Sequence, residues 1–154
     1  MTNWTGTTPT VAAGAKVRGA DIATLAAIAT AQTDAWTSYT PTLSGWTLNN
    51  GTMTAFYKQI GKEVWFRGQI TWGSTTSASG DLNVALPVTG FRAPCAIGTA
   101  YANDTSAGVT YPGVAALFGS IAFFVAGTKN VSNTQPFTWA SGDSFIWWIK
   151  YEIS

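Results

Sequence analysis

Hydrophobic residues recur along the chain with two different periods. Within residues 20–35, Ile22, Leu25 and Ala29 follow one another at spacings of three and four, and the pattern continues to Trp36. Such spacing places the side chains on one face of a helix. From Trp36 onward the period changes to two, which is typical of β-strands. The sequence therefore predicts one short helix followed by a β-domain.

Turn-forming residues divide the β-domain into short alternating segments. Clusters of Gly, Asn and Ser separate the segments, and Asn50-Gly51 is a strong signal for a tight hairpin turn. About eight strands at such close spacing predict a mainly β fold, with an antiparallel β-sandwich or jelly-roll-like domain. The expected strands cover residues 36–43, 52–60, 62–72, 81–88, 95–104, 114–118, 120–127 and 144–153.

Two of the expected strands carry apolar side chains on both faces. One face of each should form the core, and these residues are Val64, Phe66, Ile70 and Trp72 in one strand and Phe145, Trp147, Ile149, Tyr151 and Ile153 in the other. The opposite faces carry Trp65, Ile146 and Trp148 beside Arg67 and Gln69. That is more apolar surface than a small monomer usually exposes. We expect neighbouring copies to bury it; alternatively, these aromatic side chains are scattered over the surface or lie under loops.

Residues 1–19 are expected to form an extended arm, because Pro9 and three glycines interrupt any helical pattern. The predicted helix is too short to be stable alone in water, so it should pack on its own sheet or in a multichain bundle. It is also too short to span a membrane. The chain thus divides into an arm and helix for anchoring and oligomerisation, residues 1–35, and a β-sandwich domain, residues 36–154. The expected interface residues are Trp4, Ile22, Leu25, Ile28, Ala29, Trp36, Trp65 and Trp148.

Charge is scarce, and this excludes several classes of partner. Charged residues make up 10% of the chain, against about 25% in ordinary globular domains, and the net charge is +1 without long runs of either sign. Such a chain has no basic surface for nucleic acid. Cys95 is the single cysteine and there is no histidine, so we expect neither a disulfide nor a zinc or copper site, and no other cofactor.

The sequence offers little from which to build catalysis. Seven carboxylates and no histidine leave few groups for general acid–base chemistry, and no G-x-S-x-G elbow or phosphate-binding glycine loop occurs. We therefore expect a non-enzymatic protein. Two carboxylates that meet in space, as in a glycosidase, remain the alternative.

A sugar-binding surface is the binding function most compatible with this composition. Aromatic rings offer flat apolar faces, and Asn and Thr add neutral hydrogen-bonding groups beside them. The aromatic residues near expected turns, which could form such a patch, are Trp46, Trp72, Tyr101, Tyr111 and Trp139.

The order of motifs over residues 20–154 resembles that of bacteriophage virion proteins. In sequence, GAKVRGADIATLAAIATAQTDAW is followed by WTSYTPTLSGW, AFYKQIGKEVWFRGQITWG, LNVALPVTGF and SGDSFIWWIKYEI. This looks like the arm, short helix and β-domain shared by tail-fibre tips, minor tail proteins and capsid decoration or head-fibre proteins. The resemblance implies a homotrimer on the virion surface, made in the host cytoplasm.

The short stretch before the β-domain bears on the choice among these roles. Residues before Trp36 are too few to form a long fibre shaft, and they suit a protein seated directly on a shell. We therefore expect a capsid decoration protein that binds the major capsid protein, or another virion protein, through Thr2 to Ala35 and stabilises the shell. The alternative is a minor tail or tail-fibre protein that binds a host cell-surface glycan.

Overall fold

A computed structural model describes residues 19–33, 35–89, 96–118, 121–126 and 129–153 of the chain. The predicted arm, including Trp4, and Cys95 lie outside these residues. In the described part, no helix is long and apolar enough to cross a membrane.

The protein is mainly β, with one short α-helix and an antiparallel arrangement consistent with a β-sandwich, so the predicted fold class is confirmed. The helix occupies nearly the predicted residues, and the strands Thr52–Ile60, Glu63–Thr71 and Ser144–Glu152 coincide with predicted segments. The longest described strand, Val109–Phe118, begins five residues before the predicted segment 114–118. The elements are α1 (Gly19–Thr33), β1 (Thr37–Tyr39), β2 (Leu43–Thr47), β3 (Thr52–Ile60), β4 (Glu63–Thr71), β5 (Ser77–Ala85), β6 (Ala96–Asp104), β7 (Val109–Phe118), β8 (Ile121–Ala126), β9 (Lys129–Asn130) and β10 (Ser144–Glu152).

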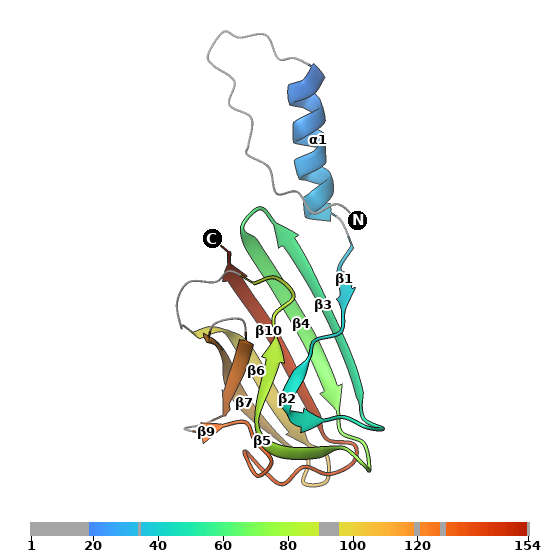
Figure 1. Cartoon of the computed structure of the whole chain (residues 1–154), viewed down its shortest axis with the longest axis vertical. Coiled ribbons are helices and arrows are strands. Elements are labelled where there is room, and N and C mark those ends of the chain that lie inside the picture. The colour runs from blue at the N-terminus through green and yellow to red at the C-terminus, as the bar shows by residue number, and fades with distance from the viewer. Residues whose placement is uncertain (1–18, 34, 90–95, 119–120, 127–128, 154) are drawn as a thin grey trace.

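The strands form one unclosed sheet in the order β1-β3-β4-β10-β6-β7-β8-β5-β2, with β9 added beside β8. The sheet bends on itself, so that β2 and β5 lie across the layer of β3, β4 and β10 (Figure 1). Between β1 and β2 the chain passes from one edge of the sheet to the other. Two hydrogen bonds hold this crossing: the Tyr39 hydroxyl donates to the Leu86 carbonyl at 3.1 Å, and the Ala85 N–H donates to the Thr42 carbonyl at 2.9 Å.

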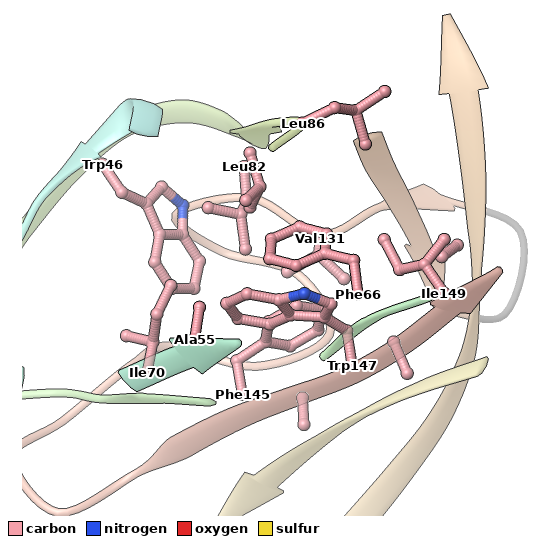
Figure 2. Close-up of a cluster of buried hydrophobic side chains, with 14 of the residues drawn as sticks. Trp46, Ala55, Phe66, Ile70, Leu82, Leu86, Val131, Phe145, Trp147 and Ile149 are labelled. Carbon is pink, nitrogen blue, oxygen red and sulfur yellow. The ribbon is translucent and has the colours of Figure 1, made fainter. Parts of the chain in front are cut away.

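The core fills the space between the two layers and is rich in aromatic rings. Figure 2 shows Trp46 and Leu82 facing Phe66, Phe145 and Trp147 across this space. The inward faces predicted for the two long strands are confirmed. Buried members are Val64, Phe66, Ile70, Trp72, Phe145, Trp147, Ile149 and Tyr151, and Ile153 is partly buried against them.

Two strands form where the sequence pattern indicated breaks. Residues 43–46 were expected in part as a turn but belong to β2, and residues 77–80, within an expected loop, begin β5. β2 and β5 pair with each other, so backbone hydrogen bonds between them compensate for weak side-chain alternation. Small residues such as Ser, Ala and Gly carry too little hydrophobic contrast for a period of two to be visible.

Tyr151 is buried at the end of the core and connects β10 to the segment after β5. Its hydroxyl donates to the Val88 carbonyl at 2.7 Å and accepts the Val88 N–H at 3.3 Å. Burial raises the pKa of Tyr151 above its ordinary value near 10, and burial likewise raises the pKa of Tyr39. Both phenols therefore stay protonated in the folded protein under conditions that ionise them in the unfolded chain.

We expect the free energy of unfolding to be insensitive to these tyrosines below about pH 10 and to fall above it. The unfolded chain then releases protons that the folded protein retains, so Tyr151 alone contributes a slope of about −1.4 kcal/mol per pH unit. Urea unfolding between about pH 8 and about pH 11 measures the slope. The variant Tyr151→Phe should be less stable at neutral pH but show a shallower alkaline decline. An equal slope in the variant would contradict this assignment.

Candidate functional site

The helix α1 projects beyond the end of the sheet, at the junction with β1 (Figure 1). It does not lie over the β-domain, so the first of the two packing alternatives for this helix is excluded. Ile22 is 58% exposed and Leu25 52% exposed, while Ile28 is partly buried and Ala29 exposed. The helix thus presents apolar side chains that its own domain leaves uncovered.

The threonines of α1 add little polarity to this helix. The hydroxyls of Thr24, Thr30 and Thr33 donate to carbonyl oxygens one turn earlier, at 2.9, 2.8 and 3.2 Å. A hydroxyl bonded in this way presents mainly its methyl group to the surroundings. Asp21 is the only charged residue in the helix. A helix that is apolar on most sides is normally found buried.

The second exposed surface is the outer face of the sheet, defined here as the side of β3, β4, β10 and β6 that points away from the core. Strand register arranges its side chains in rows across the four strands. One row is Phe56, Arg67, Trp148 and Thr99, and the next is Thr54, Gln69, Ile146 and Tyr101. The face therefore combines aromatic rings, neutral polar groups and one guanidinium.

Three tryptophans gather around Arg67 on the outer face. The Trp36 and Trp148 rings meet edge to face at 5.4 Å between centroids, and Trp65 meets Trp148 at 6.2 Å. The Arg67 guanidinium carbon lies 4.3 Å from the Trp36 ring centroid and 5.7 Å from those of Phe56 and Trp148. Such cation–π contacts favour the charged group at the ring faces. Because Trp36 directly precedes β1, these contacts also attach the base of the helical segment to the sheet.

Arg67 differs from Lys150, another cation on this face, in its electrostatic partners. Lys150 forms an ion pair with Glu63 and lies 5.5 Å from the Trp65 ring centroid. For Arg67, by contrast, no carboxylate within the described residues lies at ion-pair distance. Among these residues, the aromatic rings of Trp36, Phe56 and Trp148 are therefore the groups that contact its positive charge.

The expected interface residues fall into two groups. Trp36, Trp65 and Trp148 meet on the outer face, and Ile22, Leu25, Ile28 and Ala29 lie on α1. The sequence pattern indicated these residues through their periodicity. It missed Phe56 and Thr99, and it indicated Tyr101 only as a possible glycan-binding residue; strand pairing brings all three onto the outer face.

The predicted sugar-binding patch is wrong for Trp46, Trp72 and Trp139. These side chains are 4%, 8% and 7% exposed and form one core cluster, with Trp46 at 5.0 Å from Trp72 and 4.8 Å from Trp139. Tyr111 packs on Phe137 at 5.2 Å. Only Tyr101, at 40% exposure, stands open on the surface. A position near a turn does not reveal whether a side chain points inward, and here the inward direction places the indoles in the core.

The carboxylates in turns have structural partners. Asp143 is buried, and its two oxygens accept the N–H groups of Thr105 at 2.9 Å and Ala140 at 2.6 Å. Asp104 accepts the Ala107 N–H and the Ser106 hydroxyl, and these hydrogen bonds lower the pKa of Asp104. Within the described ranges, no group of three His, Cys, Asp or Glu residues could hold a metal ion.

No protein-family model, curated protein or solved structure matches this chain.

Proposed function

We propose that this chain is a non-enzymatic structural component of a bacteriophage virion, and specifically a capsid decoration protein that works as a homotrimer. Three copies associate through α1, and the N-terminal region attaches the trimer to the major capsid protein or to another virion protein. The β-domain then projects from the virion surface.

The observation that carries this proposal is the uncovered apolar helix. A helix of fifteen residues is marginally stable by itself in water. Ile22 and Leu25 remain more than half exposed in the single chain, although their burial would contribute about 1.5–3 kcal/mol each. Association of several copies around these residues supplies both the missing contacts and the stability of the helix.

The order of motifs from the helix to the last strand supports placement in a virion. A decoration protein needs no chemistry, because binding at symmetry-related positions stabilises the assembled shell by mass action. The arrangement of the described carboxylates at turns and in an ion pair is in keeping with such a mechanical role.

The oligomeric state of the full chain tests the proposal. Light scattering coupled to size-exclusion chromatography should give three times the chain mass of 16.2 kDa. In the double variant Ile22→Lys and Leu25→Lys, two buried charges would oppose association, and we expect a single chain mass with an unchanged β-sheet circular dichroism spectrum. Lysines at the exposed turn positions Asn133 and Thr134 add the same charge and should leave the trimer intact.

A wild-type chain that stays monomeric at micromolar concentration, about 10 μM, would contradict the trimer. Location is tested separately by immuno-gold labelling of particles of the phage that encodes the chain. Label on heads supports a decoration protein. Label confined to tail tips would contradict it and favour the tail-fibre alternative.

A further inference from the structure

The outer face contains a groove lined by side chains of the β-domain. It has a volume of about 400 Å³ and crosses β3, β4, β10 and β6. Phe56, Arg67 and Trp148 border it on one row of the sheet, and Gln69, Ile146 and Tyr101 on the next. Grooves of this volume suit a small ligand or a short segment of a longer one.

Among the described residues that line the groove, Arg67 is the only charged one. Aromatic rings lie near its guanidinium, at 4.3 Å for Trp36 and 5.7 Å for Phe56 and Trp148. A guanidinium has five N–H donors in its plane, and ring contacts do not satisfy them. Among the residues that the structure covers, Arg67 has neither a carboxylate partner nor a side-chain hydrogen bond. The guanidinium thus offers N–H donors in a fixed arrangement to an anion. Its partial burial strengthens the electrostatic attraction between the two.

The other residues of the groove indicate which uncharged chemical groups the bound anion should have. Trp148 is 41% exposed and Tyr101 40% exposed, so both present ring surface to a bound molecule. Thr54, Gln69 and Thr99 supply neutral hydroxyl and amide groups in the same groove. An aromatic platform beside neutral hydrogen-bonding groups is complementary to a sugar ring, which has an apolar C–H face and a rim of hydroxyls.

We propose that this groove binds a carboxylated sugar, with the carboxylate on Arg67 and the pyranose ring on Trp148. The sugar class follows from the combination of one cation, exposed aromatic rings and neutral polar groups. This site replaces the buried tryptophans that the sequence pattern indicated for glycan binding. It lies on the β-domain and assigns to a ligand Trp148, which the sequence pattern indicated as an interface residue.

Two ligands with different carboxylated sugars test the proposal: 3′-sialyllactose and digalacturonic acid, each titrated calorimetrically into the full chain. At least one should bind with a dissociation constant of about 1 mM or tighter. Lactose, which lacks the carboxylate, should bind at least about tenfold more weakly than sialyllactose. The monomeric helix variant described above should bind as the wild type does, which separates this test from that of the trimer.

Matched substitutions locate the contact. Arg67→Gln keeps a hydrogen-bonding side chain but removes the charge, and it should weaken binding about 10- to 100-fold. Trp148→Ala removes the ring platform and should also weaken binding, whereas Trp148→Phe should retain most of it. Lys150→Gln removes the ion-paired cation on the same face, outside the groove, and should change affinity less than about threefold.

The wild-type chain provides a measurement that does not depend on the folding of any variant. In two-dimensional ¹⁵N NMR, the acidic sugar should shift the Trp148 indole N–H and the backbone amides of Gln69 and Tyr101. The proposal is overturned if neither acidic sugar binds, if lactose binds equally well, if Arg67→Gln binds like the wild type, or if the shifts lie elsewhere. Tighter binding of an acidic peptide, such as tetraglutamate, would likewise overturn the sugar assignment.

Discussion

Replacement of Trp46 by alanine is expected to lower the free energy of unfolding by about 3–5 kcal/mol. The Trp46 ring is 4% exposed and lies 5.0 Å from Trp72, 4.8 Å from Trp139 and 6.4 Å from Phe145, measured between centroids. Its removal leaves a cavity between β2 and β10, because the surrounding rings are packed in the core and cannot move far enough to fill the space. Domains of this size are stable by only about 5–15 kcal/mol, so much of the total would be lost.

Urea unfolding followed by circular dichroism measures this effect, and Trp148→Ala is the matched control. Trp148 is 41% exposed, so its truncation should cost about 1 kcal/mol or less. Equal losses in the two variants would show that Trp46 is not a core residue. The comparison therefore also tests the burial of Trp46, which is what makes this side chain unavailable to a ligand.

Gly45→Ala is expected to destabilise the domain by about 2–5 kcal/mol. Gly45 has a φ of 81°, in the left-handed region, where a side chain costs about 1–2 kcal/mol. A Cβ atom at this position would also overlap the backbone carbonyl of Asp81, and such overpacking costs about 1–3 kcal/mol. The Leu82 N–H next to Asp81 donates to the Val131 carbonyl at 2.8 Å, and β5 is paired on either side of Asp81, so this backbone has little freedom to move away.

The role of Gly45 explains why so small a change has a large effect. The register between β2 and β5 shifts between Ser44 and Trp46, and the inward and outward alternation of β2 changes phase there. Leu43 and Trp46 consequently both pack against the core. The bulge is what turns Trp46 inward.

Gly80→Ala is the control for this prediction. Gly80 lies in β5, and nothing comes within 4 Å of a Cβ built there. Its replacement should be neutral or stabilising by up to about 1 kcal/mol, because alanine restricts the unfolded chain. Thermal and urea unfolding of both variants distinguish the two sites. If Gly45→Ala were as stable as Gly80→Ala, the bulge would not constrain β2.

The candidate surfaces were only partly predictable from the sequence. Periodicity identified Ile22 and Leu25 on the helix, and alternation identified Trp65 and Trp148 as outward-facing, because each strand or helix shows its own faces directly. The groove around Arg67 was not predictable, since it requires Phe56 from β3 and Trp148 from β10 to flank β4. Strands pair through backbone N–H and C=O groups, which residues of nearly every type have. The sequence therefore gives little indication of which strands are neighbours.

The sequence by itself determined that the protein is mainly β with one short helix, and which side of β4 and of β10 faces the core. These properties depend on local periodicity and on hydrophobic contrast between neighbouring positions. Only the tertiary structure decided the strand order, the crossing of the chain between the sheet edges at Thr40–Thr42, and the burial of Trp46 and Trp139. The strand order depends on long-range pairing, and the inward direction of Trp46 depends on the bulge at Gly45, which reverses the direction of a side chain without changing the hydrophobic pattern around it.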